Sequence, residues 1–111
     1  MKRVLFDEDM PRQLRRDLPE FEVRTVQEEG WSSVQNGELL LRAARTFDVF
    51  VTADQRLQYQ QNIPQFDIGV VVIAARDTRL PHLQLLLPQL RSAILNVTPG
   101  SVVIVSRSDW Q

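Results

Sequence analysis

The sequence predicts a single α/β domain with a mostly parallel sheet of four or five strands and helices on both faces. Short apolar runs alternate along the chain with segments whose apolar residues recur every three to four positions. Two of the runs, Val49–Val51 and Ile68–Ala74, are apolar throughout, as in strands covered on both faces. The 111 residues contain no linker or repeat, so we assign one domain, 1–111.

Each expected element has a local cause. Pro11 suits the first turn of a helix to about Leu18, Asn36 is a good N-cap for a helix to about Phe47, and Pro88 should kink or divide the leucine-rich helix that contains it. The expected strands cover residues 2–6, 21–26, 49–51, 68–74 and 102–105, and the expected helices 11–18, 36–47, 55–61 and about 83–94. Right-handed crossovers would bring the loops that follow the strands to one edge of the sheet.

Composition excludes several classes of protein. The chain has no cysteine, which rules out disulfides and thiolate metal sites. Its N-terminus does not resemble a signal peptide and no apolar run is long enough to span a membrane, so we expect a soluble, cytoplasmic protein with no membrane partner. The net charge of −1 argues against a non-specific nucleic-acid binder with a large basic face. Twelve of the 13 basic residues are arginine, which suits phosphate contacts, although GC-rich coding is the simpler explanation.

Acidic residues gather where strands are expected to end. Asp7, Glu8 and Asp9 directly follow the first strand, and Asp54 follows the third. In open α/β sheets the site lies at the carboxyl ends of the strands, so these carboxylates share a crevice if the first and third strands are neighbours. Consecutive acids raise one another's pKa unless a cation compensates. Carboxylates without His or Cys suit Mg²⁺ or Mn²⁺, and we expect such an ion on these four acids and Glu38.

Each acid also has a structural explanation. One of the three consecutive acids can cap the helix that starts near Pro11. Glu38 lies in the first turn of its helix, where it favours the helix dipole, and Arg42 is available four residues further on. Asp54 can cap the helix that follows it, a contact typically worth about 1 kcal/mol. The case for a shared site therefore depends on the fold bringing separated acids together.

Three segments carry a family resemblance. Leu5-Phe6-Asp7-Glu8-Asp9-Met10-Pro11 resembles the LLDENLP opening of compact PIN-like proteins, which are predicted bacterial nucleases. Gly30-Trp31 with Asn36-Gly37-Glu38-Leu39-Leu40 resembles their GW…NGELL segment, and residues 47–54 with 59–62 resemble their FDVLVTxD…YQQN segment. The likeness runs from about residue 3 to 75 and implies a PIN-like three-layer sandwich.

The resemblance implies a nuclease. PIN-domain nucleases, which include the toxin ribonucleases of toxin–antitoxin pairs, cleave RNA with Mg²⁺ or Mn²⁺ held by acids. On this basis Asp7, Glu38 and Asp54 would be the catalytic acids of an endoribonuclease acting on single-stranded RNA, with an antitoxin or a second copy as partner. The residues expected to contact substrate are Thr52, Arg12, Arg56, Tyr59, Gln60 and Gln61. The chain has no clear place for the further glutamate of larger PIN domains, and Asp9 stands where the group often has asparagine.

Two other functions stay open. A receiver domain of a two-component system is also a small doubly wound fold, with an acidic pair after the first strand, here Glu8 and Asp9, and a phosphoacceptor after the third, here Asp54. The lysine that receivers need after the fifth strand is missing from residues 103–107, and Ala74-Ala75 replaces their hydroxyl after the fourth. The third possibility is a PIN-like binding module that keeps the acids without turnover.

Overall fold

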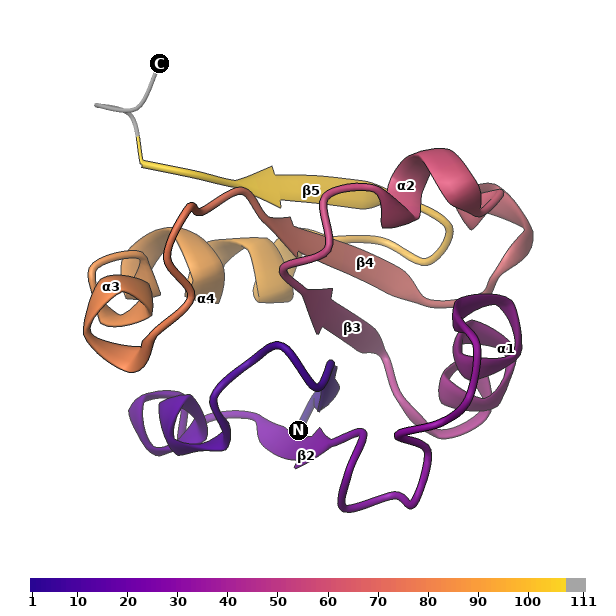
Figure 1. The fold of residues 1–111 in the computed structure, drawn as a ribbon, viewed down its shortest axis with the longest axis horizontal. Helices are drawn as coiled ribbons and strands as arrows, with labels where there is room; N and C mark the ends of the chain where they lie inside the picture. The colour runs from indigo at the N-terminus through magenta and orange to yellow at the C-terminus, as the bar shows by residue number, and fades with distance from the viewer. Residues whose placement is uncertain (108–111) are drawn as a thin grey trace.

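Within residues 1–107, five strands form one sheet in the order β2-β1-β3-β4-β5, and every neighbouring pair is parallel (Figure 1). The computed structural model describes residues 1–107. The strands are β1 (Arg3–Phe6), β2 (Glu22–Thr25), β3 (Val49–Thr52), β4 (Gly69–Ile73) and β5 (Val102–Val105). The helices are α1 (Asn36–Thr46), α2 (Leu57–Gln60), α3 (Leu80–Gln84) and α4 (Leu87–Asn96), with 3₁₀ helices η1 (Arg12–Asp17) and η2 (Ile63–Gln65). The predicted α/β fold with a parallel sheet is confirmed.

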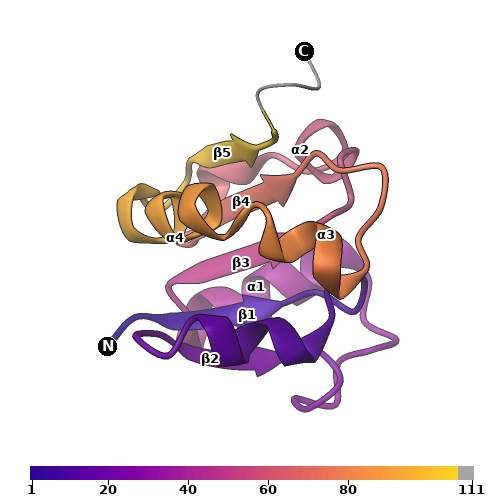
Figure 2. The same cartoon turned by 90° about the vertical axis from the view of Figure 1, so that its left-hand side faces the viewer.

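The sheet has an apolar core on each face. β3 and β4 are buried along their whole length, which explains why their sequences are apolar without alternation. On one face, Phe6 and Val51 pack under η1, α3 and α4. On the other face, Leu5 and Phe50 pack under α1, α2 and η2. Figure 2 shows η1, α3 and α4 in front of the sheet and α1 behind it.

The connection from β4 to β5 has the opposite hand from the other three. We call the face of the sheet covered by η1, α3 and α4 the η1 face, and the face covered by α1, α2 and η2 the α1 face. The connection from β1 to β2 crosses the η1 face. The connections from β2 to β3 and from β3 to β4 run in the opposite direction along the sheet and cross the α1 face, so all three have the same hand. From β4 to β5 the chain keeps that direction but crosses the η1 face through α3 and α4 (Figure 2). Since about 98% of such crossovers are right-handed, the last one is a rare left-handed connection. The expectation of right-handed crossovers throughout is wrong here.

Several element boundaries differ from the sequence prediction. Pro88 does divide the leucine-rich segment, because it lies in the first turn of α4, where its missing N–H costs nothing. Asn36 is the first residue of α1 and not its cap, since Gln35 holds the N-cap position in an extended conformation without a side-chain hydrogen bond. The helix after Pro11 is a short 3₁₀ helix anchored by the buried Leu14. Among residues 1–107, none of the helices has the length and apolar character needed to cross a membrane.

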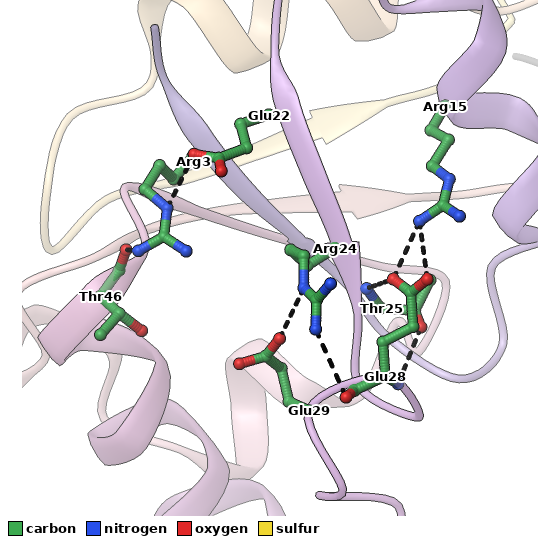
Figure 3. A network of polar contacts seen from close by, with 8 residues as sticks. All are labelled: Arg3, Arg15, Glu22, Arg24, Thr25, Glu28, Glu29 and Thr46. Atoms are coloured by element: carbon green, nitrogen blue, oxygen red, sulfur yellow. Dashed lines mark hydrogen bonds and ion pairs between the residues drawn. The ribbon is translucent and has the colours of Figure 1, made fainter.

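Charged side chains cover the β2 edge of the sheet. Arg3 on β1 pairs with Glu22 on β2 at 3.0 Å, and Arg24 on β2 pairs with Glu29 at 2.7 Å (Figure 3). Exposed pairs of this kind each contribute only about 0.2–1 kcal/mol. Their larger effect is to place charge on an edge strand, which discourages pairing with the strand of another molecule.

Gly69 opens β4 where the chain leaving α4 passes close to the sheet. A Cβ on Gly69 would lie 2.8 Å from Cγ1 and 3.0 Å from Cγ2 of the buried Val97. We predict that Gly69→Ala lowers the free energy of unfolding in urea by about 1–3 kcal/mol through overpacking. Val97→Ala removes both methyl groups, so the double variant should lose less stability than the two single variants added together. Strictly additive losses would contradict this close contact.

Candidate functional site

Residues from β1 and β3 meet at the carboxyl edge of the sheet. The two strands are neighbours, with Phe6 opposite Val51, and the amide of Asp7 donates to the Val51 carbonyl at 2.9 Å. β1 leads to β2 on one side and lies beside β3 on the other, so the order of strands reverses at this point. Ligands of open α/β sheets bind at such reversal points, beyond the carboxyl ends of the strands. The first and third strands are therefore neighbours, which is the condition under which Asp7 and Asp54 were expected to share a crevice.

Thr52 joins three acidic residues. Its side chain is fully buried at the end of β3, and its hydroxyl donates to Oδ2 of Asp7 at 2.7 Å. The Thr52 oxygen also lies 3.4 Å from Oδ2 of Asp9 and accepts the backbone N–H of Asp54 at 3.0 Å. Because a hydroxyl has one proton, the shorter contact to Asp7 takes it. Thr52 therefore orients the Asp7 carboxylate directly.

Asp9 has the most perturbed carboxylate of the group. Its two oxygens accept the backbone N–H of Ala53, each at 3.2 Å. Burial of the carboxylate is the largest cause that raises its pKa, followed by the charge of Asp7 and, more weakly, that of Asp54. The hydrogen bond from the Ala53 N–H opposes this rise, and the pKa is about 6. Asp9 is exposed as a whole residue, so water screens part of this field even though the carboxylate itself turns inward.

Asp54 is held in a turn of its own. Its Oδ1 accepts the backbone N–H of Arg56 at 3.0 Å and lies 3.4 Å from the Arg56 Nε. The same pattern recurs after β4, where Oδ1 of Asp77 accepts the backbone N–H and the Nε of Arg79 at 2.9 and 3.0 Å. The arginine contact is thus a local feature of an Asp-x-Arg turn. What distinguishes Asp54 from Asp77 is its position beside Thr52, Asp7 and Asp9.

Glu38 makes its contact elsewhere. It lies 3.7 Å from the Nε of Arg42 on the same helix, as its structural explanation predicted, and its side chain is half exposed. It also lines a groove of about 480 Å³ together with Trp31 and Arg45. Glu8 is exposed, and its backbone N–H donates to Oδ1 of Asp7 at 2.9 Å. A role for either glutamate at a metal stays a prediction.

The donor set suits a hard cation in type. Asp7, Asp9 and Thr52 offer oxygen ligands at one point, and the repulsion that raises the Asp9 pKa is what a bound cation would relieve. Within residues 1–107, however, no group of three or more acidic or histidine side chains is arranged to hold a metal ion. To bind the same metal ion as Asp7 and Asp9, the Asp54 carboxylate would have to leave Arg56, whose side chain is 78% exposed. Such a surface ion pair is worth about 0–1 kcal/mol, and loss of the backbone hydrogen bond from Arg56 to the same carboxylate adds about 1.5–3 kcal/mol.

The predicted substrate-binding residues are spread around this edge. Arg12 is exposed at the start of η1. Tyr59 is 83% exposed beside a groove of about 270 Å³, and Gln60 next to it is also exposed. Gln61 lies against the first turn of α1, because a Cβ on Gly37 would be 3.2 Å from its Oε1. Contact of these side chains with RNA stays a prediction.

A polar cluster after β4 was not predicted from the sequence. Asp77 binds the guanidinium of Arg79 at 2.6 Å and the Nε2 of His82 at 3.1 Å. The hydrogen bonds from Arg79 hold the pKa of Asp77 well below its usual range. The Asp-x-Arg pattern shared with Asp54 was the available signal. Arg79 pairs with Asp77 as Arg56 does with Asp54, whereas neither Asp7 nor Asp9 pairs with a basic side chain within residues 1–107.

Asp9 gives the site a measurable dependence on pH. Its pKa rises from an ordinary 3.8 to about 6, so the folded chain binds this proton more tightly than the unfolded chain. The associated stability is present below pH 3.8 and is lost as the pH rises through 6. We therefore predict that Asp9→Asn, compared with the wild type, gains about 1 kcal/mol of stability between acid and mildly alkaline pH, after allowance for solvent screening. Urea unfolding at several pH values measures this gain.

Asp77→Asn is the matched control, because the pKa shift of Asp77 has the opposite sign. Its variant should lose stability relative to the wild type at neutral pH, and the loss should vanish toward acid pH. If Asp9→Asn also becomes relatively less stable as the pH rises, the Asp9 carboxylate is stabilised in the fold and its inferred repulsion is wrong.

The geometry of the site is the basis for assigning it a function. Comparison of the chain with known proteins finds no matching family model, no similar curated protein and no similar solved structure. The resemblance of its segments to PIN-like proteins therefore stays a prediction.

Proposed function

We propose that the protein is a metal-dependent nuclease, an endoribonuclease that hydrolyses single-stranded RNA at the edge where β1 and β3 end. One observation carries the proposal: Asp7, Asp9 and Asp54 surround the buried hydroxyl of Thr52, and Asp9 keeps a raised pKa. Asp77 is paired with Arg79, whereas Asp7 and Asp9 accept only hydroxyl and N–H hydrogen bonds within residues 1–107. A carboxylate with a raised pKa at the reversal point of a parallel sheet supports a functional site.

The residues of the chain have distinct roles in this proposal. Asp7 and Asp9 would hold Mg²⁺ or Mn²⁺, which when bound polarises the phosphate and lowers the pKa of a coordinated water. Thr52 fixes the orientation of the Asp7 carboxylate through its 2.7 Å hydrogen bond. Asp54, released from Arg56, would orient the attacking water. Water adds to phosphorus, the P–O bond to the leaving nucleotide breaks, and the leaving oxygen takes up a proton.

Arg56 links substrate binding to the acids. Its guanidinium is exposed and pairs with Asp54 through a weak contact of 3.4 Å. A phosphate group can accept two parallel hydrogen bonds from the planar guanidinium, whereas Asp54 receives only one long contact from it. Arrival of RNA would draw Arg56 toward the phosphate and free Asp54 for the site. Arg12, Tyr59, Gln60 and Gln61 remain the proposed contacts to the rest of the RNA, and a protein antitoxin would act by covering this edge.

The order of the strands favours one other candidate function. The order β2-β1-β3-β4-β5 with acids after β1 and β3 is also that of flavodoxin-like receivers, in which Asp54 would accept a phosphoryl group. Ser106 and Arg107 follow β5 where receivers need a lysine, and the left-handed connection into β5 departs from their regular winding. These differences make the receiver the weaker proposal.

We predict Mn²⁺- or Mg²⁺-dependent cleavage of single-stranded RNA that EDTA abolishes. Asp7→Asn and Asp54→Asn should each lower the rate by about 100-fold or more, because each removes a charge that acts in the transition state. Asp77→Asn is the control, since Asp77 makes the same turn contact as Asp54 outside the acidic group. Equal losses in the Asp54 and Asp77 variants, or cleavage that persists in EDTA, would contradict the proposal.

The same variants distinguish an inactive binding module. Mn²⁺ should raise the free energy of unfolding of the wild type, as any ligand of the folded state does, and this gain should shrink in Asp7→Asn. A chain that Mn²⁺ stabilises through Asp7 but that cuts neither RNA nor DNA is a binding module and not a nuclease.

Treatment with acetyl phosphate separates the receiver from the nuclease. We expect the intact mass to stay unchanged, because Asp54 lacks the lysine that would stabilise a phosphoryl group. A labile adduct that forms on the wild type and is absent from Asp54→Asn would favour the receiver. Asp77→Asn, which keeps both Asp54 and the acidic pair, is the matched control.

A further inference from the structure

The two edges of the sheet differ in their protection. On the β2 edge, Glu22 and Arg24 place charges along the strand, and both are held in ion pairs (Figure 3). The β5 edge consists of Val102-Val103-Ile104-Val105, which has neither charge nor proline. Ile104 is 46% exposed at its centre. Proteins normally protect edge strands with charge, proline or a covering element, and within residues 1–107 β5 has none of these protections on its outer side.

β5 also presents free backbone groups. The carbonyls of Ser101 and Val105 accept the N–H groups of Val70 in β4 and of Ala74 just after it, so these residues point their backbone toward the sheet. Because the direction alternates along a strand, the N–H and C=O groups of Val102 and Ile104 point away from β4. This edge therefore offers two donors and two acceptors to another strand.

The surface beside the edge carries no charge. A groove of about 510 Å³ runs between α4 and β5. Its lining residues are Pro88, Gln89, Ser92, Ala93, Asn96, Val103, Ile104, Val105 and Ser106. None of them is charged, although charged residues make up 24% of the chain. A two-fold contact places such a patch against its own copy, so a charged residue near the axis would lie close to the same charge, and an uncharged lining avoids this repulsion.

We propose that β5 pairs with β5 of a second copy of this chain, forming one continuous ten-stranded sheet. The strands would run antiparallel about a two-fold axis at Val103. Val102 then lies opposite Ile104 of the second copy, and each such pair exchanges two backbone hydrogen bonds. Val103 faces its own copy in the non-hydrogen-bonded position, and the two α4 helices lie side by side over the same face. This arrangement is independent of the proposed nuclease function.

Cysteine cross-linking tests the register, because the chain has no cysteine of its own. Facing residues of a non-hydrogen-bonded pair have Cα atoms about 4.5 Å apart, within the range of a disulfide. Val103→Cys should therefore form a covalent dimer readily under mild oxidation. Ile104→Cys is the control for register, because residue 104 of one copy lies opposite residue 102 of the other and not opposite residue 104. Gln13→Cys on η1 is the control for cross-linking by random collision. Both controls should stay largely monomeric.

The molar mass of the protein in solution gives a second test, which needs no introduced cysteine. Light scattering should give the wild type twice the mass of the 12.8 kDa chain. Ile104→Lys places like charges together at the edge and should halve that mass, whereas Ile104→Val should leave it unchanged. A wild type that stays at monomer mass, or cross-linking of Val103→Cys no faster than that of Gln13→Cys, overturns the proposal. Faster cross-linking through Ile104→Cys than through Val103→Cys overturns the register.

Discussion

The pairing of β1 with β3 is the constraint on which the site depends. Asp7 and Asp9 are about 45 residues away from Thr52 and Asp54 in the sequence, and only the alignment of Phe6 with Val51 brings the two loops together. The strand residues next to this edge are fully buried, so the loops that carry the acids start from a rigid part of the sheet. Burial is also the first cause of the raised Asp9 pKa. The same core that stabilises the fold therefore gives the carboxylates their chemical character.

The left-handed connection into β5 shapes the other end of the molecule. A right-handed return would have carried α3 and α4 over the α1 face and covered Ile104. Instead α4 packs on the η1 face, where Arg91 pairs with Glu20 and Gln84 donates to Asp17 across to η1. The α1 face of β5 keeps an exposed isoleucine as a result. The unusual hand thus favours a tightly joined layer of helices on one face and leaves the last strand accessible.

The sequence was sufficient where local pattern determines structure. The apolar runs located all five strands, and Pro88 marked the division between α3 and α4, because burial and the missing N–H of proline act locally. It was insufficient where the outcome depends on contacts across the chain. Packing between segments determines the hand of the connection from β4 to β5. It also determines the contact of Asp77 with His82 and whether Glu38 or Asp9 lies beside Asp7. No periodic pattern in the sequence predicts these contacts.

The comparison of Asp54 with Asp77 shows how far a motif can be interpreted. Both are followed by an arginine two residues later, and both accept its backbone N–H in the same turn. In Asp77 the arginine and histidine satisfy the charge, and its pKa falls. In Asp54 the same turn stands beside two further carboxylates and a buried hydroxyl, and its charge adds to the field that raises the pKa of Asp9. The turn alone is structural in both places. Asp54 differs from Asp77 in the neighbours that the loop after β1 places beside it, and these neighbours support a functional role for Asp54.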